Sequence, residues 1–429
     1  MKKESFCLLF LFISCFCFAQ TSADPDLLEK AKRIHKKVIT IDTHNDIEIE
    51  NFTDEKNYTQ DIDTQVNIPK MEKGGMDVSW MIVYTEQGPL TEEGYQKAYN
   101  NAMLKFIAIH KLVNELAPDK LALATTSEEV RKQVKEGKKV VMIGVENGYP
   151  IGTDIENVEK FYALGARYMS LAHQGHSQLS DSNSGEEKDE WQHHGLSELG
   201  KKVIVEMNRL GIMVDISHPS KEAIKQMLAL TKAPVIASHS SARALCDNSR
   251  NLDDELLKLV KKNGGVVQAV AFAGYINAEK DKRYEEAASK VYEQQAEKLN
   301  FHVLPEDSIA ALDQEAKTSY YDDFYKVRKQ AAPGIAELKK KIGPVNVQDF
   351  VDHIDYLVDL IGIDHVGISS DFDGGGGIEG WEDASQSLNV TIELVKRGYT
   401  EEEIAKLWGE NLLRVLDEVQ AVARKLQKA

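Results

Sequence analysis

Residues 196–239 read LSELGKKVIVEMNRLGIMVDISHPSKEAIKQMLALTKAPVIASH, and this stretch decides the fold. Two amphipathic segments, Leu196–Arg209 and Lys221–Leu230, carry apolar residues at helical spacing. Each is followed by a short apolar run, Ile212–Ile216 and Pro234–Ala237, of the kind that forms a buried strand. The stretch therefore predicts helix, strand, helix, strand, with a Ser-His pair directly after each strand.

The same alternation continues on both sides of this stretch. Six further short apolar runs bring the candidate strands to eight: Val38–Ile41, Val78–Val83, Val140–Gly144, Ala166–Leu171, Gly265–Phe272 and His365–Ile368. Strand and helix repeated eight times are typical of the α/β class and predict a (β/α)8 TIM barrel. A doubly wound open sheet is the alternative, but no glycine-rich phosphate loop follows the first strand.

The alternation breaks at one place, from about residue 277 to residue 338. This part of the chain is charged and bears several tyrosines, including the run Tyr320-Tyr321-Asp322-Asp323-Phe324. We expect a helical insertion after the seventh strand. On a barrel it would lie at the rim, either covering the site or extending into solvent.

The first residues resemble an export signal. Lys2 and Lys3 precede an apolar run from Phe6 to Phe18, which is shorter than the roughly 20 residues that span a bilayer. We expect residues 1–19 to be a signal peptide and residues 20–429 a single domain, exported to a periplasm or secreted. Lipoprotein anchoring through a cysteine of this segment is the alternative. No later segment has the pattern of a transmembrane span.

Cysteine content and charge exclude some classes of partner and of covalent bond. Removal of the signal segment would leave Cys246 as the only thiol, which excludes internal disulfides. The formal net charge of −17 disfavours nucleic acid as a partner.

Most of the predicted strands are followed directly by side chains that can bind metal. They are His44, Asp46, Glu146, His173, His218, His239, Asp371 and Asp373. A single histidine in such a position is more often an ordinary rim residue. Barrel enzymes, however, build their active sites at the carboxyl ends of the strands, so we expect these side chains to converge on one metal site.

The spacing of these residues predicts how they would share two ions. His44 and Asp46 point to the same side of an extended chain and can bind one ion. His218 and His239 end neighbouring strands and offer a second ion the nitrogen ligands that suit zinc. Glu146 lies between the pairs and can bridge two Zn2+ ions about 3.5–4 Å apart, although an ordinary rim carboxylate is the alternative. Such ions would produce a metal-bound hydroxide that attacks an amide carbonyl.

Seven motifs together resemble the membrane (renal) dipeptidase family, whose members are amidohydrolase-like barrels. They lie at residues 41–46, 143–146, 215–219, 238–242, 249–251, 365–374 and 409–415. The resemblance spans nearly all of residues 20–429 and implies one metallo-dependent hydrolase domain. It also implies a homodimer.

The resemblance further implies a role for each residue of the site. His44 and Asp46 would bind one zinc, His218 and His239 the other, and Glu146 both. His173 would contact the scissile carbonyl and stabilise the oxyanion, and Arg250 would bind the carboxylate of the substrate. Asp371 would exchange protons with the water and the leaving amine, with Asp373 as the second candidate.

The function implied is a zinc-dependent dipeptidase that accepts small dipeptides, including those with a D-residue at the C-terminal position. A related binuclear-zinc amidohydrolase acting on another small amide or lactam is the alternative, because the metal centre sets the nucleophile and not the substrate. A binding protein that has kept the fold and lost turnover is a third reading.

Overall fold

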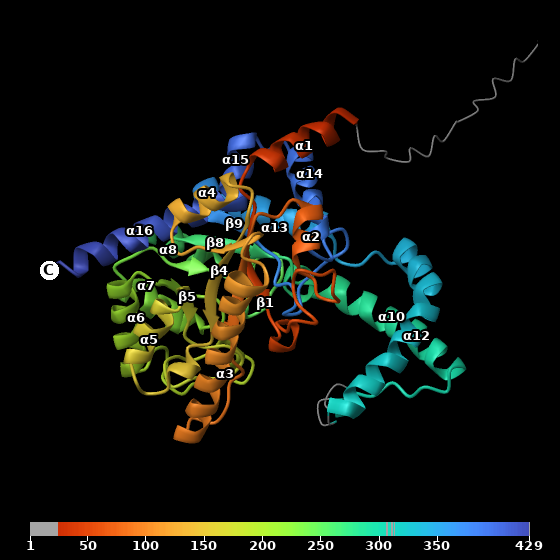
Figure 1. Ribbon diagram of the computed structural model, residues 1–429, viewed down its shortest axis with the longest axis horizontal. Coiled ribbons are helices and arrows are strands. Elements are labelled where there is room, and N and C mark those ends of the chain that lie inside the picture. Colours follow the sequence, from red (N-terminus) through yellow and green to blue (C-terminus); the bar gives the residue numbers. More distant parts are fainter. Residues whose placement is uncertain (1–24, 306–307, 310–311, 313, 429) are drawn as a thin grey trace, which may run out of the picture.

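A computed structural model describes residues 25–428 apart from 306–307, 310–311 and 313. Eight parallel strands follow one another around a nearly closed barrel (Figure 1). They are β1 Ile41–Asp46, β2 Val78–Tyr84, β4 Lys139–Glu146, β5 Ala166–Ser170, β6 Met213–Asp215, β7 Ile236–Ala237, β8 Val266–Val270 and β9 Val366–Ser369. The predicted TIM barrel is confirmed.

The barrel closes between its first and last strands. Asn45 of β1 pairs in parallel with Phe372, which follows β9, and the Asp46 N–H donates to the Phe372 carbonyl at 2.8 Å. A ninth strand that the sequence did not predict, β3 Leu121–Leu123, pairs with the start of β4. Strand β3 pairs with β4 at Lys139–Val141, and β5 pairs with β4 only from Ile143 onward.

Helices cover the outside of the barrel. From β2 onward, the helices that follow successive barrel strands are α3 Glu92–Lys111, α5 Glu156–Ala163, α6 Glu198–Leu210, α7 Lys221–Leu230, α8 Asp254–Asn263, α13 Val347–Ile361 and α14 Leu388–Lys396. The remaining helices are α1 Pro25–Lys37, α2 Ile68–Gly74, α4 Ser127–Lys135, α9 Ala273–Ile276, α10 Ala278–Lys298, α12 Gln314–Lys341, α15 Glu401–Ala405 and α16 Asn411–Leu426.

Local signals in the deciding stretch set these boundaries. Ser197 and Ser220 begin α6 and α7, since each hydroxyl accepts a hydrogen bond from a backbone N–H of the first turn. Gly211, at φ 93°, ends α6 in the left-handed region that glycine adopts without strain. The chain then turns directly into β6.

Two layers of core hold the barrel. One lies between the strands and the outer helices, and the other fills the interior of the barrel, where Trp80 stacks on Tyr168 with ring centroids 4.9 Å apart. Leu412 and Leu416 of α16 belong to the interior cluster, so the last helix closes the amino-terminal end of the barrel. The opposite end remains available for the site.

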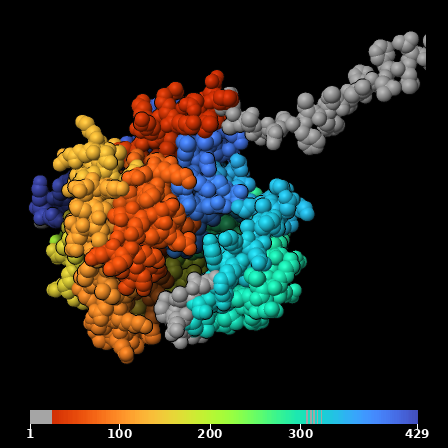
Figure 2. All heavy atoms as spheres, turned by 45° about the vertical axis from the view of Figure 1, so that its right-hand side comes forward, coloured from red at the N-terminus to blue at the C-terminus, as the bar shows by residue number. Residues whose placement is uncertain are grey.

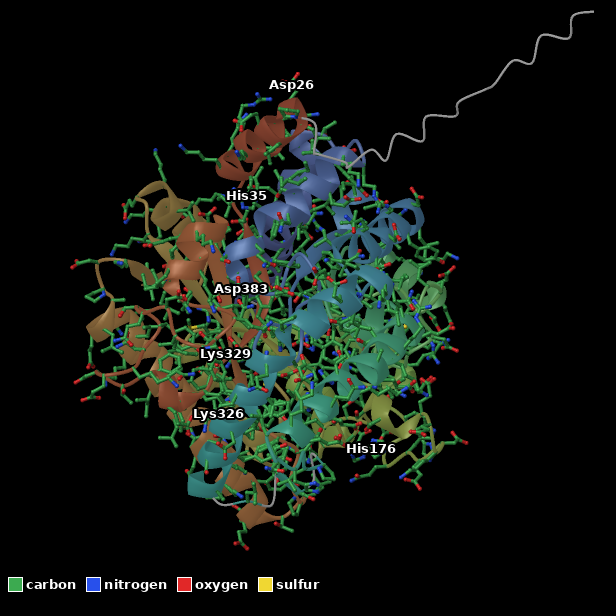
Figure 3. The ribbon with its side chains drawn as sticks, turned by 90° about the vertical axis from the view of Figure 1, so that its right-hand side faces the viewer. Asp26, His35, His176, Lys326, Lys329 and Asp383 are labelled. Carbon is green, nitrogen blue, oxygen red and sulfur yellow. The ribbon has the colours of Figure 1, made fainter. Side chains whose placement is uncertain are left out.

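The insertion lies between β8 and α13, where the sequence predicted it. Helices α10 and α12 pack side by side and project from the barrel (Figure 1). In Figure 3, α12 carries Lys326 and Lys329, and Lys329 lines a hollow together with Asp63, so the insertion reaches back toward the N-terminal part of the chain. The predicted signal peptide lies outside the described residues. Within the described part of the chain, no helix combines the length and apolar character needed to cross a bilayer.

Candidate active site

The carboxyl ends of the strands surround a cavity of about 290 Å³. Figure 2 shows the surface hollowed between the orange N-terminal elements and the cyan insertion. The cavity is lined by Asp46, Glu48, Tyr84, Glu146, His173, Gln174, His218, His239, Arg250, Phe272, Tyr275, Asp371, Asp373 and Gly374. Every predicted site residue except His44 therefore lines one cavity, and His44 lies buried directly beside it.

Glu146 lies between the two predicted ligand pairs. Its Oε1 atom is 2.8 Å from His218 Nε2 and 3.3 Å from His239 Nε2, whereas its Oε2 atom is 3.4 Å from His44 Nε2. The carboxylate is buried at the end of β4. One oxygen thus faces each side, which is the geometry that a bridging carboxylate needs.

The donor atoms fit divalent cations. Three groups have ligand atoms within 4.8 Å of one another: His44 with Asp46 and Glu146, His44 with His239 and Asp371, and Glu146 with His173 and His218. His44 Nε2 and Asp46 Oδ1 are buried and have no hydrogen-bond partner among the described residues. Buried polar atoms are costly when unpaired, so a cation that uses them as ligands accounts for their arrangement.

A tyrosine fixes the protonation of His44. The Tyr168 hydroxyl donates to the Thr43 carbonyl at 2.9 Å, and its oxygen lies 2.9 Å from His44 Nδ1. Because the single hydroxyl proton is directed at Thr43, Nδ1–H of His44 donates to Tyr168. The lone pair of a neutral His44 is then on Nε2, the atom that faces Asp46 and Glu146.

A serine and an aspartate fix the tautomer of His239 in the same way. Ser238 Oγ donates to Asp215 Oδ2 at 2.6 Å and lies 2.7 Å from His239 Nδ1. Nδ1–H of His239 therefore donates to Ser238, which leaves the Nε2 lone pair directed at Glu146. Hydrogen bonds behind both ligands thus orient them for a cation.

The charges of the cluster depend strongly on one another. Burial would raise the pKa of Glu146, but the imidazoles of His44 and His173 outweigh it and hold this pKa well below its usual range. Burial opposes protonation of His44, yet the carboxylates of Glu146 and Asp46 raise its pKa well above 6.5. Burial lowers the pKa of His218 and His239, which keeps these two imidazoles neutral as metal ligands require.

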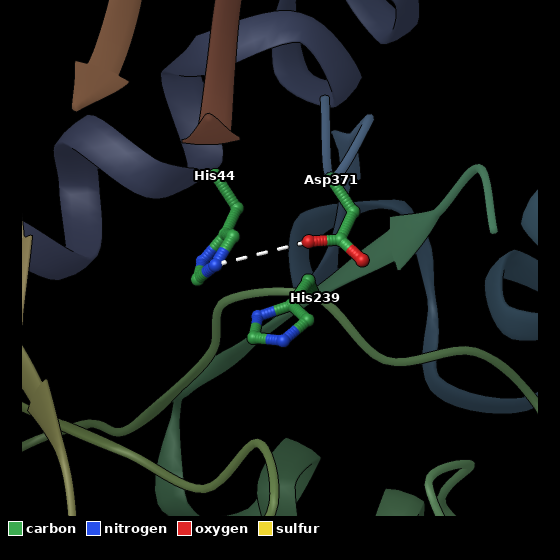
Figure 4. A group of neighbouring side chains, drawn as sticks. All are labelled: His44, His239 and Asp371. Atoms are coloured by element: carbon green, nitrogen blue, oxygen red, sulfur yellow. Dashed lines mark ion pairs between the residues drawn. The ribbon is translucent and has the colours of Figure 1, made fainter. Parts of the chain in front are cut away.

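Asp371 and Asp373 have different surroundings. Asp371 Oδ1 lies 3.8 Å from His44 Nε2, and Figure 4 shows the carboxylate facing His44 above His239. Burial, reinforced by Asp46 and Glu146, raises the pKa of Asp371 to about 8. The carboxylate of Asp373 instead accepts from the backbone N–H groups of Gln65 and Val66. Asp373 therefore holds a loop, whereas the Asp371 carboxylate faces the cavity.

The backbone at the site is strained. His218 has φ 78° and Asp371 has φ 61°, in the left-handed region that non-glycine residues rarely adopt. Beside Asp371, a Cβ atom on Gly374 would lie 2.3 Å from Asp46 Oδ2. The missing side chain of Gly374 thus lets this turn approach the Asp46 carboxylate closely.

Arg250 supplies positive charge to the cavity wall. Its side chain is buried, with one Nη donating to the His239 carbonyl at 3.3 Å, while Nε and the other Nη have no partner among the described residues. The guanidinium lies 5.4 Å from the centre of the Tyr275 ring. His173, whose ring is tilted 59° to that of Tyr84 at 4.7 Å between centroids, lines the same cavity. An anionic group in the cavity would satisfy the free guanidinium N–H groups.

The sequence did not predict three residues that position the candidate ligands. Tyr168 lies in an apolar run and reads as core, Asp215 lies inside a predicted strand, and Ser238 reads only as the neighbour of a candidate ligand, so no spacing rule singles them out. A weak signal exists at Gly144, where a Cβ would lie 2.1 Å from the Tyr168 ring. A glycine inside a strand indicates the close approach of another group.

Comparisons with known proteins identify the family and the fold of the chain. A family model described as membrane dipeptidase (Peptidase family M19) matches residues 28–429. Dipeptidase aclJ of Aspergillus oryzae is 30% identical over 434 residues, which cover 96% of this chain and 87% of that protein. The probable dipeptidase PvdM of Pseudomonas aeruginosa has 28% identity and a TM-score of 0.75, covering 94% of this chain and 100% of that one. A metallopeptidase of Rhodobacter sphaeroides, liganded with a phosphinate mimic of L-Ala-D-Ala, shares the fold at 21% identity and a TM-score of 0.65, covering 89% of this chain and 99% of that one.

Proposed function

The chain belongs to the membrane dipeptidase family, and from this premise we propose that it is a zinc-dependent dipeptidase. The observation that carries the proposal is Arg250. Its unpaired N–H groups line the same small cavity as the candidate metal ligands, so an anionic group and a scissile bond can be held at once. A dipeptide has its carboxylate one residue beyond its peptide bond, which suits this arrangement.

The donor set supports two zinc ions. His44 and Asp46 would hold one ion and His218 and His239 the other, with Glu146 shared between them. When bound, such ions lower the pKa of water toward neutrality and polarise an amide carbonyl. Tyr168 and Ser238 accept the Nδ1 protons of His44 and His239, so Nε2 of each ring is the nitrogen that would bind an ion.

The remaining residues would position the substrate and move protons. Arg250 would hold the carboxylate of the substrate with two parallel charge-assisted hydrogen bonds. His173 has its pKa lowered by burial and is neutral, so its N–H would donate to the developing oxyanion. Asp371 would accept a proton during attack and deliver it to the leaving amine.

We further propose that the C-terminal residue of the substrate can have the D configuration. A guanidinium recognises the planar carboxylate, which is the same in both configurations, and thus does not itself select one. Comparison of L-Ala-D-Ala with L-Ala-L-Ala tests this point directly: refusal of the first would contradict it.

The test of the main proposal is hydrolysis of dipeptides, tripeptides and N-acetylated dipeptides by the purified protein. We expect cleavage of dipeptides only, lost with a chelator and restored by zinc. Zinc-loaded protein that is inert on every dipeptide would contradict the proposal and favour another small amide or lactam as substrate.

The N-terminal sequence supports a further proposal, that residues 1–19 direct export and are removed. The support is the pair of lysines before the apolar run Phe6–Phe18. N-terminal sequencing of protein recovered outside the cytoplasm should begin at Gln20, and lipid on Cys15 or Cys17 would instead identify a lipoprotein.

The resemblance to the dipeptidase family likewise supports a homodimer, which light scattering of the purified protein would test.

A further inference from the structure

Glu48 is a charged residue of the cavity wall that the proposed reaction does not use. It lines the cavity together with the candidate ligands, but it belongs to none of the three groups whose atoms could share a cation. It follows Asp46 by two residues, beyond the end of β1, and precedes the short 3-10 helix Ile49–Asn51. Glu48 is an exposed residue whose carboxylate is partly shielded by its neighbours, whereas the ligand carboxylate of Glu146 is buried.

The order of the strands places Glu48 across the mouth of the barrel from Arg250. Around the ring the order is β1, β2, β4, β5, β6, β7, β8, β9, so the half formed by β1 and β2 faces the half formed by β6 and β7. Glu48 follows β1, and Arg250 lies in the segment after β7. A substrate whose carboxylate binds Arg250 therefore extends its first residue toward Glu48.

The carboxylate of Glu48 is available to a ligand. No ion pair or side-chain hydrogen bond joins it to another residue in the described part of the chain. The positive charge of Lys105 acts on the Glu48 carboxylate, and its ammonium lies 5.4 Å from the centre of the Tyr84 ring. Asp46, which also lines the cavity, adds negative charge beside Glu48, so the wall opposite Arg250 is acidic.

We propose that Glu48 selects dipeptides whose N-terminal residue carries a cationic side chain, such as lysine, arginine or ornithine. The inference rests on the proposed function, because Arg250 sets the direction in which the substrate lies. The α-amino group of a dipeptide is only one carbon from the scissile carbonyl and so lies deep, near Asp46 and Asp371. A side chain, by contrast, extends outward to the carboxylate of Glu48.

The test compares lysyl-alanine with norleucyl-alanine, which has the same carbon chain and lacks the ammonium. The measured quantity is the ratio of kcat/KM for the two substrates, obtained with the zinc-loaded protein. We expect the wild-type ratio to exceed one and Glu48→Gln to lower it by about two- to fivefold, the effect of one exposed ion pair. Glu48→Lys should bring the ratio below one.

Glu50→Gln is the matched control. Glu50 is also exposed and lies two residues further along, but it does not line the cavity, so its removal should keep the wild-type ratio. Circular dichroism of each variant monitors folding, and the ratio itself is insensitive to the fraction of active protein.

Two results would overturn the inference and leave the proposed function standing. One is a ratio that Glu48→Gln and Glu48→Lys do not change. The other is a wild-type ratio of one or below, which would show that the cationic side chain gives no preference. Protein that cleaves no dipeptide at all would overturn the proposed function and this inference with it.

Discussion

Replacement of Tyr168 by phenylalanine should weaken metal binding without touching a ligand. The hydroxyl serves two buried groups, His44 Nδ1–H and the Thr43 carbonyl, each at 2.9 Å. An unsatisfied buried polar group costs about 1–3 kcal/mol, so the loss of a partner by two such groups should lower the free energy of unfolding of Tyr168→Phe by about 2–6 kcal/mol. Loss of the acceptor also frees the tautomer of His44, and such changes reduce metal affinity about 10–100-fold.

The assay is competition for zinc between the protein and a chromogenic chelator, with urea unfolding of the chelated protein measured in parallel. Tyr149→Phe is the matched control, because that buried hydroxyl donates to the Pro89 carbonyl at 2.7 Å, away from the ligands. It should lose stability and keep zinc affinity. If Tyr168→Phe bound zinc as tightly as this control, the argument from the His44 tautomer would be refuted.

Three further outcomes follow from the site. Arg250→Ala should lower kcat/KM for free dipeptides about 10–150-fold, the value of charged hydrogen bonds, and kinetics equal to wild type would exclude the carboxylate-binding role. Asp371→Asn should lower kcat about 10²–10⁴-fold with zinc content retained, and an active variant would show that the proton passes elsewhere. The chelated protein should lose stability from pH 6.5 to about 8: the pKa values of His44 and Asp371 are raised on folding, so their protonated forms favour the native state until pH passes those values. Thermal melting with a chelator present measures this, and a flat profile would contradict it.

The fold was predictable because the short apolar runs are buried in the core regardless of which residues flank them. Seven of the eight predicted strands overlap the observed ones along most of their length, but the first begins at Ile41, where its prediction ended. Residues 42–46 are polar and read as a loop, yet they extend the strand because buried partners satisfy them. The Asp42 carboxylate, for example, accepts from the Ser370 N–H at 2.9 Å and from Asn45 Nδ2. Pairing across the barrel thus overrides local preference.

The ligand-type residues of the site were predictable from their position at strand ends. The residues that orient them through hydrogen bonds were not. Side chains such as His218 and His239 follow strands that meet at one rim, so sequence order already brings them together. Tyr168 and Asp215 act from inside the strands, and their roles depend on which atoms face them across the barrel. The distinction between Asp371 and Asp373 likewise needed the backbone of Gln65 and Val66, from a distant part of the chain.

The place where the barrel closes determines when an active enzyme can exist. His44 and Asp46 lie on the first strand, and Asp371 follows the last, with the two strands joined through Asn45 and Phe372. A growing chain has made all five candidate metal ligands by His239, but it lacks Asp371 and the closing strand until about 130 residues later. With Asp371 in its proposed role, synthesis of this peptidase and its activity are separated in time by the order of its strands.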